Sequence, residues 1–276
     1  MGVTNASMIG RTPYYVLTGG LAVIFLFPIL WAAVASVSPQ AGTGQTVGIG
    51  LGNYATLFNF GAGLPRFLFN SLLVAFLVVA ITLVVSALGG YAFARFSFPG
   101  RDVLFLLTLA ILMVPYATVL IPLYVMLHGI GLQNSLVGVS LVLVVFQLPF
   151  ATYMMRISFE AVPRELDESA MMDGCGPFSV LWRILLPSVR PGLITVSLFA
   201  FLAAWNDFFA PLIMLNDPTQ QTLPLAIANL RQQTMGVIDY GATEAGVVVM
   251  ALPCLILFLF LQRHFVAGFM SGAVKG

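Results

Sequence analysis

Residues 67–94 read FLFNSLLVAFLVVAITLVVSALGGYAFA, and none of these side chains is charged. A helix needs roughly 20 apolar residues to cross the hydrocarbon core of a bilayer. The stretch therefore predicts a transmembrane helix. A transmembrane strand would instead alternate apolar and polar residues over about ten positions, and this pattern is absent.

The remainder of the chain has the same character. Of the 276 residues, 60% are hydrophobic and 8% are charged, and the mean hydropathy is +1.02. A soluble domain carries about 25% charged residues, so this composition excludes a soluble enzyme of ordinary architecture. The net charge of +1 gives no basic field for nucleic acid. We predict an all-α integral membrane protein with a single transmembrane domain over residues 1–276.

Apolar stretches of spanning length occur six times. They are residues 14–37, 67–94, 103–127, 136–155, 191–215 and 245–262. No Lys or Arg lies within them, and Asp207 is their only acidic residue. Prolines in five of the six predict bent helices, which are common in membrane proteins and also suit a bundle that moves. Ala33-Val34-Ala35 resembles a signal-peptide cleavage site, but the preceding apolar run is longer than a signal core.

Basic residues are distributed unevenly between the connections. With a cytoplasmic N-terminus, the outer connections contain only Arg66 and Arg231. The inner segments then contain Arg11, Arg95, Arg101, Arg156, Arg164, Arg183, Arg190, Arg263 and Lys275. Cytoplasmic connections carry the excess of Lys and Arg, so we predict that both termini are cytoplasmic.

The connection 156–190 is the longest inner one and carries its own helix signals. Pro163 suits a first helical position, and Gly174 can take the left-handed conformation that ends a helix. Pro177 can begin a second helix, which Pro187 stops. Half of the ten acidic residues are in this connection: Glu160, Glu165, Asp167, Glu168 and Asp173. The pattern predicts a helix, a tight turn and a helix on the cytoplasmic side.

Two interpretations of this hairpin are open. Val162, Leu166 and Ala170 have helical spacing and predict one apolar stripe, which would suit a helix lying on the lipid surface. Interfacial helices are usually rich in Lys and Arg, whereas Arg164 is the only base in this first helix. An anionic leaflet repels acidic residues, so the charge favours docking on a protein partner.

The same segment resembles a known motif. Glu168-Ser169-Ala170, Gly174 and Ile184-Leu185-Leu186-Pro187 are similar to the Glu-Ala-Ala loop of permease subunits from ATP-binding-cassette importers. The spacing matches throughout, and Ser169 replaces the first alanine. The chain resembles the carbohydrate branch in particular, through Pro163-Arg164-Glu165-Leu166-Asp167-Glu168, Asp173-Gly174, Asn53-Tyr54, Asn70-Ser71, Tyr91-Ala92-Phe93-Ala94-Arg95, Trp205-Asn206-Asp207-Phe208 and the tail 272–276. Ser38-Pro39 departs from the Lys-Pro that the family often has after the first span.

The resemblance implies a type I importer permease fold with six transmembrane helices and a cytoplasmic coupling helix-turn-helix between spans 4 and 5. It implies four kinds of partner: a second permease, two cassette ATPases, an extracytoplasmic sugar-binding protein or lipoprotein, and the lipid of a bacterial plasma membrane. The substrate class would be a di- or oligosaccharide of the maltose or trehalose type. The residues that would couple to the ATPase are Glu165, Glu168, Ser169, Ala170, Asp173, Gly174, Ile184 and Pro187.

Several chemistries lack the residues they need. A cassette ATPase requires a phosphate-binding loop with a lysine, and the only lysine is Lys275. ATP and Mg would therefore bind a partner chain, with no cofactor on this one. His128 and His264 are the only histidines, and neither belongs to a nucleophile–base set or a metal-ligand spacing. We expect no catalytic residues, no metal site and no enzymatic activity.

The group Trp205, Asn206 and Asp207 lies within the fifth expected span. An ionisable residue at membrane depth usually faces the bundle interior or a water-filled path. Asp207 and Asn206 could line the sugar path or its gate, or could bond the partner permease. Trp205 could stack on sugar or pack a helix. The polar outer loop 216–243 could reach the binding protein or simply be solvated.

Other functions remain as alternatives. A cassette permease for another solute, such as glycerol phosphate or peptide, would have the same loop. A proton-coupled secondary transporter could use Asp207 and Glu244 as a relay, although it would not explain the hairpin. A membrane enzyme is disfavoured because no nucleophile–base set is present.

Overall fold

The computed structural model describes residues 12–38, 49–233 and 239–273. All regular structure in these ranges is helical, and they contain no strand. Contacts between Cα atoms divide the chain into two compact units, residues 1–63 with 227–252 and residues 64–226 with 253–276.

The first unit is organised around one asparagine. Its elements are α2 (Thr12–Val37), α3 (Gly52–Asn59), and parts of α13 (Leu223–Gln233) and α14 (Tyr240–Ala273). The side-chain amide of Asn53 donates to the carbonyl oxygens of Ser36 and Ser38 at the end of α2, at 2.9 Å each. A Cβ atom at Gly241 would lie 2.5 Å from the Asn53 amide. Asn53 therefore joins α2 to α3, and its amide leaves room only for a glycine at position 241 of α14.

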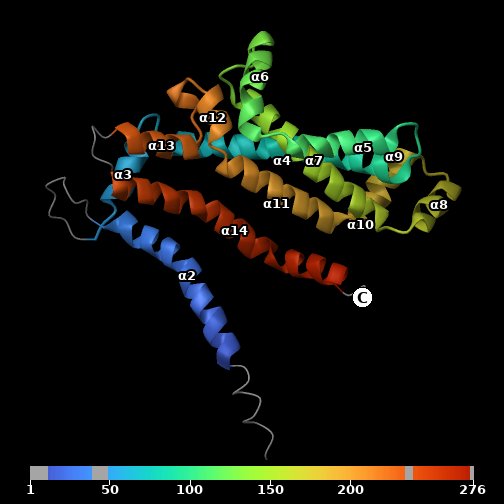
Figure 1. Ribbon diagram of the computed structural model, residues 1–276, viewed down its shortest axis with the longest axis horizontal. Helices are drawn as coiled ribbons and strands as arrows, with labels where there is room; N and C mark the ends of the chain where they lie inside the picture. The colour runs from blue at the N-terminus through green and yellow to red at the C-terminus, as the bar shows by residue number, and fades with distance from the viewer. Residues whose placement is uncertain (1–11, 39–48, 234–238, 274–276) are drawn as a thin grey trace, which may run out of the picture. The chain divides into compact units, whose positions relative to one another are not determined.

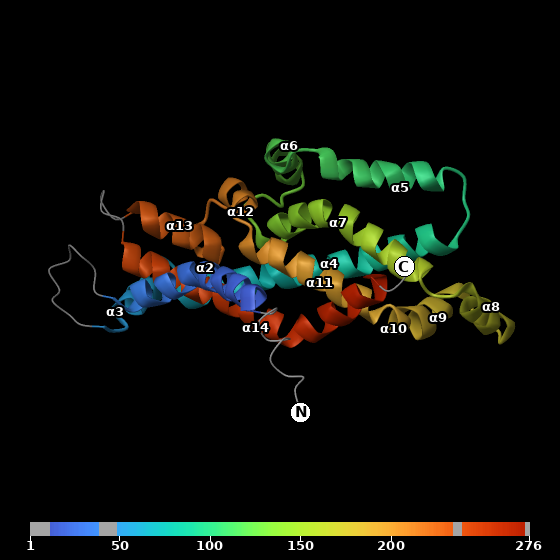
Figure 2. The same cartoon turned by 60° about the horizontal axis from the view of Figure 1, so that its bottom comes forward.

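Three helices pack side by side to form the core of the second unit (Figures 1 and 2). They are α4 (Leu64–Arg95), α7 (Leu136–Glu160) and α11 (Arg190–Asn206). The helices α4 and α7 approach closely at Gly90, where a Cβ atom would lie 2.6 Å from Met155 Cβ and 2.8 Å from the backbone nitrogen of Arg156. Glycine at this position therefore sets the separation of the two helices.

The third expected span is strongly bent. It consists of α5 (Arg101–Ala110), a 3-10 turn (Ile111–Met113) and α6 (Tyr116–Gly129). The two halves meet at 106°, so α6 projects away from α4 and α7 (Figure 1). Val114 and Pro115 are extended at the break, and Pro115 disfavours the helical conformation of Val114, the residue before it.

The fifth expected span is also interrupted. The segment that precedes it contains α9 (Pro177–Val180), a π-helical turn (Leu181–Leu185) and α10 (Leu186–Ser188), and it meets α11 at 79°. After α11, Asp207 and Phe208 break the helix before α12 (Phe209–Met214), a 3-10 turn (Pro218–Gln220) and α13.

The prediction of an all-helical chain with several apolar spans is confirmed. Four helices in the described ranges are long and apolar enough to cross a membrane, and the count is six if each bent pair is one span. The breaks at residues 114–115 and 207–208 mean that two of the six expected spans, 103–127 and 191–215, are not continuous helices.

One buried apolar cluster extends from the core of the second unit to its end. It contains Tyr91 and Ala94 of α4, Met155 and Phe159 of α7, and Leu185 of the π-helical turn. Ala170 of α8 (Arg164–Met172) belongs to the same cluster. The helix α8, which lies beyond the ends of α7 and α11 (Figures 1 and 2), is thereby attached to the bundle.

Candidate functional site: the α8 loop and its anchor on α4

The segment 161–177, here called the α8 loop, has a well-defined helix end. Gly174 has φ +86°, its N–H donates to the carbonyl of Met171 at 3.0 Å, and the N–H of Cys175 donates to the carbonyl of Ala170 at 3.0 Å. This pair of bonds is a Schellman motif, which requires the left-handed conformation that glycine adopts readily. Gly174 therefore takes the conformation that the sequence predicted for it.

The helix α8 exposes most of its surface. Asp167 and Ala170 are each 7% exposed, whereas Leu166 is 47% exposed. Of the predicted apolar stripe, Ala170 is buried, Val162 is half-buried and Leu166 is exposed, while the acidic Asp167 faces the bundle. Within the α8 loop, the expected coupling residues that are exposed are Glu165, Glu168, Ser169, Asp173 and Gly174.

The buried carboxylate of Asp167 pairs with the last residue of α4. Arg95 Nε lies 2.7 Å from Asp167 Oδ2, and the two side chains are 6% and 10% exposed. Arg95 Nη2 also donates to the carbonyl oxygen of Val162 at 2.8 Å. Burial raises the pKa of Asp167 above its usual range, and the charges of Arg95 and Arg164 oppose this rise. A buried carboxylate needs such a partner, so Arg95 is the reason that Asp167 can face the bundle.

Tyr91, one turn before Arg95, holds the other end of the α8 loop. Its hydroxyl donates to the carbonyl oxygen of Pro177 at 3.1 Å, and its ring packs edge to face against Phe159 and Phe96. Residues four apart lie on the same helix face. The last turn of α4 therefore binds the loop before α8, within it and after it.

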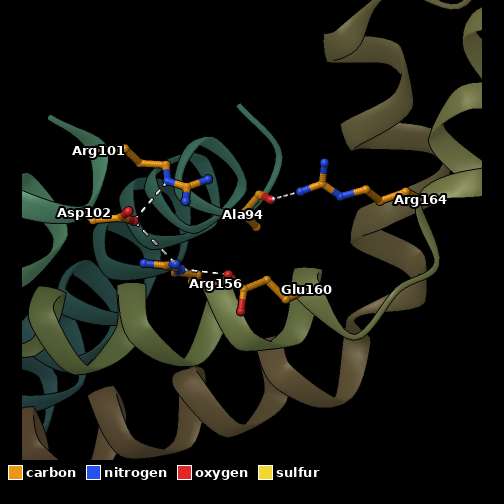
Figure 3. Close-up of polar contacts among 6 residues, drawn as sticks. All are labelled: Ala94, Arg101, Asp102, Arg156, Glu160 and Arg164. Carbon is orange, nitrogen blue, oxygen red and sulfur yellow. Dashed lines mark hydrogen bonds and ion pairs between the residues drawn. The ribbon is translucent and has the colours of Figure 1, made fainter. Parts of the chain in front are cut away.

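Other charged residues near the end of α4 make a second set of polar contacts, which Figure 3 shows. The contacts are Arg156 Nε to Glu160 Oε1 at 2.8 Å, Arg101 Nε to Asp102 Oδ1 at 3.1 Å, Arg156 Nη2 to Asp102 Oδ1 at 3.9 Å, and Arg164 Nη2 to the carbonyl oxygen of Ala94 at 3.4 Å. Arg101, Glu160 and Arg164 border an open cleft of about 580 Å³. Surface ion pairs contribute about 0–1 kcal/mol, so these contacts differ in kind from the buried Arg95–Asp167 pair.

The second half of the predicted hairpin is mostly as expected. The helix begins at Pro177 and ends at Ser188, one residue after Pro187. Ile184 is half-buried and packs against the apolar cluster, while Pro187 is exposed. Ile184 therefore contributes to the attachment of the hairpin, and Pro187 lies near its bend.

Asp207 lies in the break after α11, and not near the middle of a continuous span as the sequence predicted. Its backbone is extended. Asp207 Oδ1 accepts from the N–H of Ala210 at 2.9 Å, and Oδ2 accepts from the hydroxyl of Tyr116 at 2.8 Å. Asp207 therefore caps α12 and joins it to the start of α6, a partnership that the sequence analysis missed.

The neighbours of Asp207 have different environments. Trp205 is fully buried, and its ring stacks on Phe201 with the centroids 5.7 Å apart. Asn206 is exposed, and its side-chain amide donates to the carbonyl oxygen of Leu202 at 2.8 Å. Among these three predicted residues, Asn206 and Asp207 carry the polar groups at the break, whereas Trp205 packs within the bundle.

At the far end of α4, two residues fix part of the polar loop 216–233. The side-chain amide of Asn70, which is fully buried, donates to the carbonyl oxygens of Thr219 and Gln221 at 2.9 Å each. Ser71 Oγ accepts from the N–H of Leu223 at 2.8 Å. The predicted outer loop 216–243 is therefore bonded to α4 at Thr219, Gln221 and Leu223, and its residues 234–238 lie outside the described residues.

The architecture is that of a polytopic helical membrane protein with a small helix anchored at one end of its bundle. Residues 86–270 match the family described as the binding-protein-dependent transport system inner membrane component. The chain belongs to this family, which confirms the resemblance drawn from its motifs.

Named relatives extend the comparison over the whole chain. The arabinooligosaccharides transport system permease protein AraQ of Bacillus subtilis is 34% identical over 267 residues, which cover 93% of this chain and 92% of AraQ. The trehalose transport system permease protein SugB of Mycobacterium tuberculosis is 32% identical over 271 residues, 96% of this chain and 98% of SugB. A solved bacterial ABC transporter involved in import of the acidic polysaccharide alginate has the same fold, with a TM-score of 0.80, 21% identity, and coverage of 96% of this chain and 100% of that one.

Proposed function

We propose that this chain is the permease subunit of an ATP-binding-cassette sugar importer whose substrate is a di- or oligosaccharide of the maltose or trehalose type. It forms half of the translocation pathway, and a second permease forms the other half. The chain itself is not an enzyme, and ATP and Mg bind the partner ATPases. The family description and the names of its relatives, which transport arabinooligosaccharides and trehalose, support this proposal.

The outward surface of the α8 loop is the observation that carries the proposal. It combines acidic residues, Glu165, Glu168 and Asp173, with Met172, which is 89% exposed. An anionic membrane surface repels such a helix, whereas a protein with a basic rim around an apolar cleft complements it. Methionine adapts its shape to such a cleft. The ATPase is the partner that fits, and Ser169 has the small side chain that a close contact needs.

The orientation follows from the same assignment. The α8 loop and both termini lie in the cytoplasm of a bacterium, and the chain is a multi-pass component of the plasma membrane. The loop held by Asn70 and Ser71 then faces outward, where the sugar-binding protein or lipoprotein delivers its cargo. The break at Asp207 lies between these faces, and Asn206 and Asp207 line the sugar path or its gate.

Uptake by the assembled importer tests the proposal. The chain is co-expressed with a second permease, the ATPase and the binding protein, and uptake of labelled trehalose and maltose is measured in cells and in proteoliposomes. We expect uptake that requires ATP and the binding protein and that persists when an ionophore collapses the proton gradient. Uptake that follows the proton gradient without ATPase would instead identify a secondary transporter. ATP-dependent uptake of glycerol phosphate and not of sugar would show a permease of the same ATP-binding-cassette class with a different substrate.

A further inference from the structure

We infer that the Arg95–Asp167 pair is the link through which a displacement of α8 reaches α4, so that both are positioning residues for coupling ATP hydrolysis to transport. The inference rests on the proposed function, because it assumes that an ATPase moves α8. It concerns residues that the resemblance did not assign to the coupling set.

The pair is the buried ionic contact between α8 and α4, beside the longer hydrogen bond from Arg164 to the carbonyl oxygen of Ala94. Of the nine residues of α8, only Asp167 and Ala170 are buried. The methyl group of Ala170 makes an apolar contact that permits sliding, since such contacts are non-directional. The carboxylate of Asp167 instead lies 2.7 Å from Arg95 Nε, a close ion pair between two buried side chains, and Arg95 also donates to the carbonyl oxygen of Val162 just before α8. A rotation or shift of α8 must therefore carry Arg95 with it or break the pair.

The second partner of the pair, Arg95, lies at the end of a long helix. Arg95 is the last residue of α4, and Asn70, near the first, bonds the loop at Thr219 and Gln221. With a rise of 1.5 Å per residue, these two residues are roughly 38 Å apart along the helix. One continuous helix therefore connects the α8 loop to the loop at the opposite end of the unit, and Arg95 is where α8 joins it.

A role in positioning also explains why the contact is ionic. Replacing a buried ion pair with apolar residues is often neutral or stabilising, so such a pair is weak support for a stability role. What the pair adds is a single relative orientation of its two partners. Hydrogen bonds from Tyr91 to Pro177 and from Arg95 to Val162 hold the two segments that flank α8.

The test uses the assembled importer with Arg95→Gln, Asp167→Asn and the double variant, which leaves no unpaired buried charge. Sugar uptake, ATP hydrolysis, retained ATPase and melting temperature are measured for each. We expect each single variant to retain the ATPase and to lose about tenfold in sugar transported per ATP hydrolysed, a typical size for coupling between sites. Because the two residues act through each other, the double variant should also lose about tenfold rather than about a hundredfold.

Two further variants make the result specific. Asp102→Asn removes a carboxylate that is 73% exposed and also contacts arginines, and we expect its sugar-to-ATP ratio to equal that of the wild type. The exchanged pair, Arg95→Asp with Asp167→Arg, should transport more sugar per ATP than either exchange alone, because it restores opposite charges at the contact.

The contrary results are distinct. If the wild type couples and the single variants keep its sugar-to-ATP ratio, or if their effects multiply in the double variant, the link is refuted while the proposed function stands. If the sugar-to-ATP ratio falls only in variants that also melt at a lower temperature or lose the ATPase, the pair is a structural contact, and the link is refuted as well. A wild-type complex without ATP-dependent uptake would refute the proposed function, and the link with it.

Discussion

Gly90 allows a sharp test of how α4 and α7 fit together, because its neighbour in sequence is a matched control. A Cβ atom at Gly90 would lie 2.6 Å from Met155 Cβ, 2.8 Å from the Arg156 backbone nitrogen and 2.9 Å from the Met155 carbonyl carbon. Two of these three atoms belong to the backbone of α7, which cannot move without the helix. A Cβ atom at Gly89 would meet Thr152 Cγ2 at 3.5 Å, an ordinary contact.

The expected cost of Gly90→Ala follows from these contacts. Overpacking a tight interface costs about 1–3 kcal/mol, and alanine returns about 1 kcal/mol through its higher helix propensity. Gly89→Ala keeps the propensity gain without the clash. The two variants share the same chemical change, so their difference isolates the packing term. A difference of about 2 kcal/mol corresponds to about 4–8 °C in melting temperature for a chain of this size.

The assay is thermal unfolding of the purified permease in detergent, followed by tryptophan fluorescence, with uptake measured on the same variants. Gly90→Ala should melt below the wild type, and Gly89→Ala should melt at or above it. Equal melting temperatures for the two variants would refute the claim that Gly90 sets the separation of α4 and α7.

Three further outcomes are expected. Gly174→Val should leave the permease in the membrane but reduce ATPase pull-down or uncouple hydrolysis from uptake, since a β-branched residue at φ +86° costs roughly 1–2 kcal/mol or more. The control is Gly176→Ala, because Gly176 has φ −73° and lies in open space. Full coupling in Gly174→Val would contradict the coupling role of this turn. Asp207→Leu should insert normally yet impair uptake, because its two hydrogen-bond donors lose their acceptor, and wild-type uptake would make this carboxylate dispensable. An engineered Ser169→Cys should react with an impermeant thiol reagent only after the membrane is opened. Labelling in intact cells would place the α8 loop outside and contradict the predicted topology.

Local signals predicted the features that depend on nearby residues. The apolar run of α4 is a matter of composition and length, and its helix was predicted within a few residues of its bounds. The end of α8 depends on one glycine, because its Schellman bonds close within five residues of Gly174. Such features require no knowledge of the rest of the fold.

The remaining features depend on residues far apart in sequence. Tyr116 and Asp207 are 91 positions apart, and no local pattern joins them. The sequence places Asp167 among five acidic residues of one connection and does not distinguish it from the others, because its partner Arg95 lies on a different helix. The i, i+4 spacing of Tyr91 and Arg95 was the available signal, since it placed two hydrogen-bonding side chains on one face at the end of a helix.

The anchoring of the α8 loop on one helical turn also bears on how importers can be recombined. A chimera that receives only residues 161–177 from a relative would place a foreign loop against the native Tyr91 and Arg95. The three bonds to Val162, Asp167 and Pro177 would then survive only where the donor has matching groups. The transferable module is therefore discontinuous: the loop together with the last turn of α4. Exchanging both pieces is the rational route to a permease that accepts the ATPase of another system.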